Sequence, residues 1–128
     1  MSIPGGICCP GAELAYRVSD VFEDPEALVV VNCAGRTRSI IGAQSLINAG
    51  IPKPVVALEN GTMGWHLAGY GLDHGQVRRA PNVTENGLKR SRTMAESVAE
   101  RFGVKKVSNA ELDSICNKIV RLACLCWT

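Results

Sequence analysis

Two short apolar runs on either side of an amphipathic stretch dominate the hydrophobic pattern of this chain. The run 28–31 is continuous and β-branched, which is typical of a buried strand. From Ser39 to about Asn48, apolar residues recur at spacings of three and four, which predicts a helix with Ser39 as its N-cap. The second run, 55–58, predicts another buried strand. A helix between two strands indicates a βαβ unit with parallel, neighbouring strands.

Weaker patterns predict the remaining elements. Ser108 and Glu111 are three residues apart and form a capping box before a short helix. Ile119–Trp127 is almost wholly apolar and predicts a terminal strand. The other predicted elements are helices over 11–18 and 63–68, a helix from a cap at Thr84 or Asn86 to about Phe102, a strand over 104–107 and a helix over 112–116. This alternation of strands and helices predicts an α/β fold.

Composition narrows the class of protein. With 128 residues the chain forms at most one domain, and 46% hydrophobic with 20% charged residues is ordinary for a globular protein. The net charge of +2 is spread along the chain, so nucleic-acid binding is not indicated. The apolar runs are too short to span a membrane, and Met1–Gly5 has neither the charged region nor the apolar core of a signal peptide, so we expect a cytoplasmic protein.

Candidate chemistry is concentrated in the loop 33–38, between the first strand and the first long helix. Cys33 is the first loop residue, and the loop amides and first helical turn offer N–H groups to an anion. Arg36 and Arg38 add full positive charges. These features predict a Cys33 thiol with a lowered pKa. The alternative is that Cys33 is an inert buried cysteine. This interpretation is less favoured because Gly35, Ser39 and the two arginines lie so close in the sequence.

A second loop follows the second strand. Because the carboxyl ends of parallel strands meet at one edge of a sheet, we expect Glu59–Gly61 to form a wall of the Cys33 pocket. Trp65 is predicted to be a core or pocket-floor residue. The remaining five cysteines are Cys8, Cys9, Cys116, Cys124 and Cys126. They lack the spacing of a zinc site and are interpreted as reduced thiols. No metal and no cofactor are predicted.

Three motifs resemble one family. The loop Cys33–Ser39, with the sequence Cys-Ala-Gly-Arg-Thr-Arg-Ser, resembles the active-site loop of rhodanese-like sulfurtransferases. Asn60–Trp65 and Ala68–Tyr70 resemble that family's Gly-rich turn, tryptophan and Ala-Gly pair, and Ile3–Ile7 resembles its Ile-Pro-Gly-Ala segment. The resemblance covers about residues 2–75 and is strongest over 28–72.

The resemblance implies a three-layer fold with a central, mostly parallel sheet flanked by helices, and an enzyme that moves sulfane sulfur. Cys33 would be the nucleophile that takes the outer sulfur of an anionic donor such as thiosulfate, forming a persulfide that a thiol or cyanide then attacks. Arg36 and Arg38 would orient the donor, with buttressing of the loop as the alternative role of Arg38. The implied substrate-binding residues are Ala34, Gly35, Arg36, Thr37, Arg38 and Ser39.

Two other functions remain open. Cysteine-dependent phosphatases and arsenate reductases also use an anion-binding loop that ends in arginine, but their loop is one residue longer. Here four residues separate Cys33 from Arg38, and the smaller cradle suits a single sulfur atom better than a tetrahedral oxyanion. The second alternative is a rhodanese-like module that binds or regulates without catalysis, although such modules usually lack the cysteine that this chain retains.

The resemblance also divides the chain. Residues 1–75 correspond to a rhodanese-like catalytic core without the usual opening strand, and 76–128 comprise a linker, a helix and a helix-strand segment that resembles the start of a further rhodanese-like domain. The chain therefore resembles a fragment of a tandem-domain protein. We expect the C-terminal segment to supply the first strand, either within one chain or between two chains as a homodimer by strand exchange.

Overall fold

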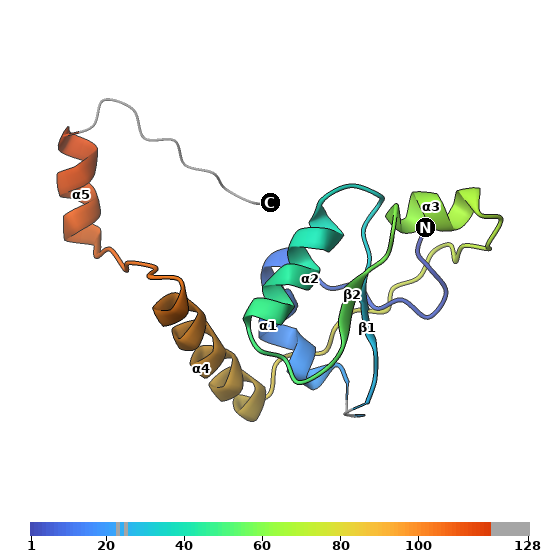
Figure 1. Cartoon of the computed structure of the whole chain (residues 1–128), viewed down its shortest axis with the longest axis horizontal. Helices are drawn as coiled ribbons and strands as arrows, with labels where there is room; N and C mark the ends of the chain where they lie inside the picture. Colours follow the sequence, from blue (N-terminus) through green and yellow to red (C-terminus); the bar gives the residue numbers. More distant parts are fainter. Residues whose placement is uncertain (23, 25, 119–128) are drawn as a thin grey trace.

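The computed structural model describes residues 1–22, 24 and 26–118. In Figure 1 the central βαβ unit lies between α3 on one side and α4 and α5 on the other. In chain order the elements are η1 (Gly11–Glu13), α1 (Leu14–Arg17), η2 (Val18–Asp20), β1 (Val29–Val31), α2 (Arg38–Asn48), β2 (Val55–Ala57), α3 (Gly61–Leu67), α4 (Glu85–Arg101) and α5 (Asn109–Lys118), where η denotes a 3₁₀ segment.

The βαβ unit confirms the prediction from the hydrophobic pattern. β1 and β2 pair in parallel, with Val29 opposite Val55 and Val31 opposite Ala57. Helix α2 connects them and packs on the same sheet. The parallel arrangement places the ends of both strands, and therefore the loops that follow them, at one edge of the sheet.

The core lies between this sheet and the helices α1 and α2. Val29 and Val31 are buried on one face of β1, and Ala43 and Leu46 of α2 are buried against them. Gly42 allows the close approach, because a Cβ there would lie 3.1 Å from Cδ2 of Leu14 and 3.2 Å from Cγ1 of Val31, tighter than most real contacts. The rigid backbone around β1 therefore supports the loop that follows it.

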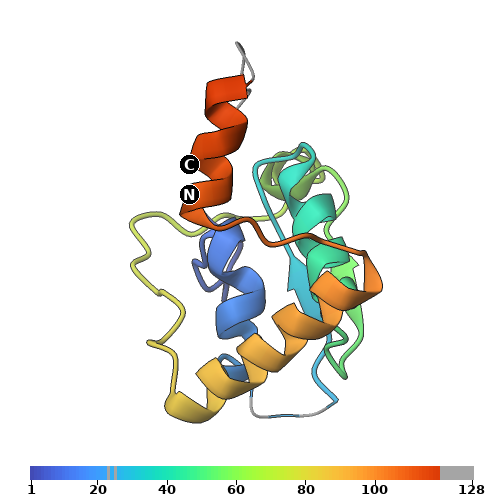
Figure 2. The same ribbon diagram turned by 90° about the vertical axis from the view of Figure 1, so that its left-hand side faces the viewer.

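The N-terminus of helix α4 is capped and is hydrogen-bonded to the end of the η2 segment. Thr84 is the N-cap, and its hydroxyl accepts a hydrogen bond from the Gly87 amide at 3.0 Å, which confirms one of the two predicted caps. The Asp20 carboxylate accepts bonds from the Thr84 amide at 2.9 Å and the Thr84 hydroxyl at 3.1 Å. Figure 2 shows α4 lying in front of α1, which it contacts. The anionic side chain at the helix N-terminus is electrostatically favourable.

The structure corrects the prediction that Ser39 caps α2. The helix begins at Arg38 with Thr37 as its N-cap, and the Thr37 side chain makes no capping hydrogen bond. Ser39 lies inside the first turn, is only 2% exposed, and its hydroxyl is bonded to Cys33. Ser39 is the second residue of the helix and does not precede it, so its hydroxyl bonds across the loop and does not cap the helix.

The C-terminal half both confirms and corrects the predictions. The capping box is confirmed, because the Ser108 amide donates to Oε2 of Glu111 at 2.7 Å and the Glu111 amide donates to Oγ of Ser108 at 3.3 Å. The strand predicted over 104–107 is wrong: these residues are exposed and irregular. The segment has two lysines between two valines, and a short strand is stable only beside a pairing partner, which 104–107 lacks among the described residues.

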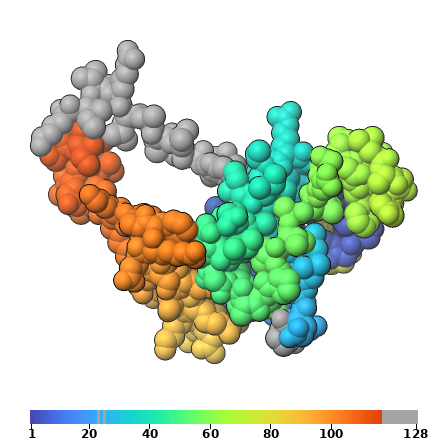
Figure 3. Space-filling view, viewed as in Figure 1, coloured from blue at the N-terminus to red at the C-terminus, as the bar shows by residue number. Residues whose placement is uncertain are grey.

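The described part of the sheet has two strands and one open apolar face. Leu28, Val30 and Val56 are 54%, 49% and 43% exposed. Figure 3 shows α2 and β2 at the surface, with α5 apart from them. The strand predicted over Ile119–Trp127, and with it the sheet's predicted opening strand, lies outside the described residues. No helix of the described part is both long and apolar enough to cross a membrane.

Candidate active site

Cys33 stands at the junction of β1 and α2. Its Sγ lies 3.3 Å from Oγ of Ser39 and 3.8 Å from the carbonyl oxygen of Arg36, so the loop closes around the sulfur. As a thiol, Cys33 has one proton, which it donates to the Ser39 hydroxyl or to the Arg36 carbonyl; as a thiolate, it accepts a hydrogen bond from the Ser39 hydroxyl. The side chain is half-buried and remains accessible to a small molecule.

The environment of the sulfur favours the thiolate. Burial acts to raise the pKa of Cys33, but hydrogen bonds to the sulfur outweigh it and lower the pKa from 9.0 to about 7. The largest lowering contribution is the Ser39 hydroxyl, followed by backbone hydrogen bonds from Gly35, Ser39 and Arg36. Hydrogen bonds to the charged form stabilise it. A substantial fraction of the Cys33 side chains is therefore ionised and nucleophilic near neutral pH.

The first turn of α3 is bonded to the active-site loop from the side opposite α2. The Thr62 amide donates to the Cys33 carbonyl at 2.8 Å, and the Met63 amide donates to the Ala34 carbonyl at 3.1 Å. The Asn32 side-chain amide also donates to the Thr62 hydroxyl at 2.9 Å. These bonds satisfy two N–H groups that a helix N-terminus otherwise leaves without partners.

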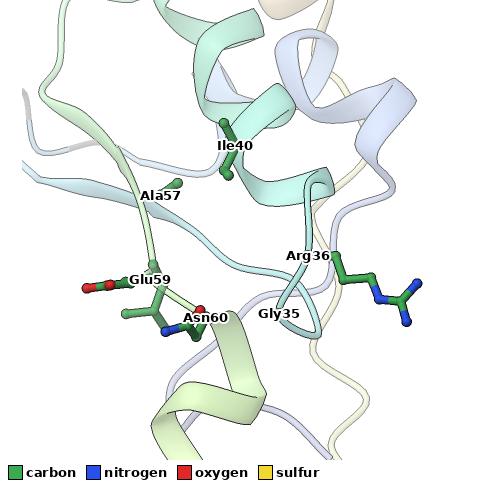
Figure 4. A pocket seen from close by; sticks show the side chains of 7 residues that line it. Gly35, Arg36, Ile40, Ala57, Glu59 and Asn60 are labelled. Atoms are coloured by element: carbon green, nitrogen blue, oxygen red, sulfur yellow. The ribbon is translucent and has the colours of Figure 1, made fainter.

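Two hollows flank the loop, each of about 450 Å³. The hollow that contains the sulfur is lined by Cys33, Ala34, Gly35, Arg36, Arg38 and Met63. The neighbouring hollow, shown in Figure 4, is lined by Gly35, Arg36, Ile40, Ala57, Leu58, Glu59 and Asn60. In that view the Arg36 side chain points away from Glu59 and Asn60.

The prediction that the loop after β2 forms a wall of the Cys33 pocket is correct for the position of the loop and wrong for the residues that line the pocket. The loop after β2 does flank the cysteine loop, but Glu59 and Asn60 line the neighbouring hollow. Met63, one helical turn further, lines the hollow of Cys33. Trp65 is in neither lining: its indole N–H donates to the Gly71 carbonyl at 2.8 Å, and its ring lies 4.8 Å from that of Tyr70.

The residues that the sequence predicted to bind the substrate have different positions relative to the Cys33 sulfur. Arg36 and Arg38 both line the Cys33 hollow and are exposed. Ser39 contacts the sulfur from the buried side, and Thr37 is the exposed N-cap, outside both linings. Sequence reasoning did not single out Thr62 or Met63 as site residues. The preceding Asn-Gly dipeptide marked a turn there, but the contacts with the loop depend on tertiary structure.

Comparison with known proteins gives one informative match. No protein-family model matches the chain, and no curated protein does. The fold is similar to the crystal structure of a thiosulfate sulfurtransferase from Pseudomonas aeruginosa, with a TM-score of 0.85 and 54% sequence identity. The match covers 91% of this chain and 22% of that protein, so the chain spans about a fifth of the relative's length. Together with the motifs around Cys33, this match supports the resemblance to rhodanese-like sulfurtransferases and shows that the chain has a rhodanese-like α/β fold.

Proposed function

We propose that this chain is a sulfurtransferase that carries sulfane sulfur on Cys33. The observation that carries the proposal is the Cys33 sulfur, half-buried in a hollow with two arginines and bonded to Ser39 and the loop backbone. The similar protein from Pseudomonas aeruginosa is named a thiosulfate sulfurtransferase, which supports the same class of reaction here.

The reaction proceeds in two displacement steps. In the first, the Cys33 thiolate attacks the outer sulfur of a donor such as thiosulfate; a sulfur–sulfur bond forms to Cys33, the bond to the sulfonate breaks, and sulfite leaves. In the second, an acceptor thiolate or cyanide attacks the outer persulfide sulfur and releases the Cys33 thiolate. Because a thiolate with a pKa of about 7 is present at neutral pH, no general base is required.

The loop residues have different proposed roles. Arg36 and Arg38 line the hollow with exposed side chains and attract the anionic donor. The backbone amides of Gly35 and Arg36 stabilise the negative charge on the sulfur in both steps. Ser39 acts on Cys33 rather than on the donor, since it contacts the sulfur from the buried side.

The acceptor and cellular location follow from the same chemistry. A small thiol or cyanide fits a half-exposed persulfide in an open hollow, and reduced thiols are abundant in the cytoplasm, the location that the sequence predicts. The proposal does not require nucleic acid or a membrane. Phosphatase activity is the competing enzymatic function, and a purely binding or regulatory module is the competing non-enzymatic one.

The decisive experiment is mass spectrometry of the full chain after incubation with thiosulfate. We expect the mass of one added sulfur atom on the Cys33 peptide, and loss of that mass with release of thiocyanate when cyanide is added. Cys33→Ser should abolish both, whereas Cys116→Ser, which changes an exposed cysteine of α5, should abolish neither. Hydrolysis of an aryl phosphate without persulfide formation would favour the phosphatase, and neither activity would favour the binding module.

A further inference from the structure

The first turn of α3 determines which way the peptide groups of the active-site loop face. The Met63 amide holds the Ala34 carbonyl at 3.1 Å. Because a peptide group is planar and trans, the N–H of the next residue points opposite to that carbonyl. The Gly35 N–H therefore points away from the Met63 amide, and the Gly35 backbone is among the groups that lower the pKa of Cys33.

A side-chain bond fixes this turn of α3 to the start of the loop. The Nδ2 group of Asn32 donates to Oγ1 of Thr62 at 2.9 Å, and the Thr62 amide donates to the Cys33 carbonyl at 2.8 Å. Thr62 thus contacts the two residues that follow β1, Asn32 and Cys33, through two different atoms. Two contacts restrict rotation of the turn more than one contact does.

We propose that Thr62 is a positioning residue for Cys33. Its hydroxyl, held by the Asn32 amide, keeps the first turn of α3 in register with the loop, so that the Gly35 N–H remains aimed at the sulfur. Thr62 does not line the Cys33 hollow, so the hydroxyl acts through the loop backbone and not on the donor. The inference concerns the state of the thiol, and its importance for turnover rests on the proposed function.

A purely structural role of Thr62 predicts a different result. Loss of a supporting hydrogen bond would lower the free energy of unfolding and leave the thiol unchanged in the folded protein. Loss of a positioning contact lets the Ala34–Gly35 peptide rotate, weakens the bond to the thiolate and raises the pKa of Cys33 in the folded protein. The pH dependence of Cys33 reactivity separates the two roles.

The test measures alkylation of Cys33 by iodoacetamide against pH in the full chain, with modification read on the Cys33 peptide by mass spectrometry. In Thr62→Val, which keeps the shape and removes the acceptor oxygen, we expect the rate at pH 7 to fall about fivefold and the inflection to move to higher pH. Thr62→Ser should restore the wild-type profile. Asn32→Ala changes an exposed residue and should reproduce the effect of Thr62→Val. Thr93→Val, which removes an exposed hydroxyl bonded to Lys89 in α4, is the control.

Alkylation requires no sulfur donor, so this result does not depend on whether Cys33 transfers sulfur. An unchanged pH profile in Thr62→Val or Asn32→Ala, with circular dichroism showing a folded protein, would overturn the positioning role. The same conclusion follows if Thr62→Ser behaves like Thr62→Val, or if Thr93→Val moves the profile equally. If sulfur transfer is also measurable, the positioning role predicts a lower kcat with an unchanged KM for the donor.

Discussion

Gly61 lies directly against the backbone of Cys33, so that any side chain at position 61 would collide with the Cys33 carbonyl oxygen. A Cβ there would also stand 2.7 Å from the Gly35 amide nitrogen. Gly61 has a φ of +55°, in the left-handed region that favours glycine. The contact brings the loops after β1 and β2 together and allows the first turn of α3 to reach the active-site loop.

Replacing this glycine should damage both the fold and the site. We expect Gly61→Ala to lower the free energy of unfolding by about 2–4 kcal/mol, since it combines an unfavourable φ with a backbone clash. The control is Gly69→Ala, because Gly69 has a φ of +86° but open space around it. The control should cost only about 1 kcal/mol. Urea unfolding measures both, and equal losses would contradict the importance of the close contact.

The Ser39 hydroxyl should control the pH profile of the reaction. The pKa of Cys33 is lowered to about 7, so the rate of persulfide formation should rise with pH up to about 7 and then level off. Ser39→Ala removes the main stabilising bond to the thiolate, which raises the pKa. We expect the inflection to move to higher pH and the rate at pH 7 to fall about fivefold, while the rate well above the new pKa recovers.

The matched control for this change lies on the same helix. Ser45→Ala removes a hydroxyl that donates to the Ile41 carbonyl on the exposed side of α2. It should leave the pH profile unchanged. A Ser39→Ala enzyme whose rate falls by the same factor at every pH would show that Ser39 affects the geometry of attack and not the ionisation of Cys33.

The two loop arginines should act chiefly on donor binding. Both side chains are exposed and line the Cys33 hollow, and neither guanidinium has a hydrogen bond within the described residues. We therefore expect Arg36→Ala and Arg38→Ala each to raise the KM for thiosulfate about tenfold, with smaller changes in kcat. Steady-state kinetics measure this, with Arg92→Ala in α4 as a charge-matched control. Loss of stability in Arg38→Ala alone would instead support the alternative role of Arg38 as a buttress of the loop.

The elements predicted from the sequence are those that depend on local chemistry. The β-branched run before Cys33 and the three- and four-residue spacing after Ser39 are enough to specify a strand and a helix, and both formed. The Thr84 cap and the Ser108–Glu111 capping box also formed, because each requires only residues within one turn.

The features that the sequence did not predict depend on tertiary structure. Ser39 looked like an N-cap because its sequence context is that of a helix start, but the nearby Cys33 sulfur is its actual partner. Residues 104–107 begin and end in β-branched valines, but within the described part of the chain they have no neighbouring strand to pair with. Thr62 contacts Cys33, 29 positions away in the chain, because β1 and β2 are parallel neighbours.

The open face of the sheet leads to the last prediction. Leu28, Val30 and Val56 expose between 43% and 54% of their surface, and each strand has a β partner on one side only within the described residues. An uncovered apolar sheet face with open edges recruits further strands. We propose that Ile119–Trp127, the apolar segment outside the described residues, pairs with this sheet, either within one chain or between two chains.

Deletion of residues 118–128 should therefore abolish cooperative unfolding or cause aggregation, because the apolar face and the strand edges lose their cover. Val30→Glu in the full chain tests the same contact from the other side, and should be much more destabilising than Val104→Glu, since Val104 is 60% exposed in the irregular segment before α5. Size-exclusion chromatography distinguishes a monomer from a strand-exchanged dimer. If the deletion variant were as stable and as active as the full chain, and Val30→Glu no worse than Val104→Glu, the segment would be dispensable and the sheet complete without it.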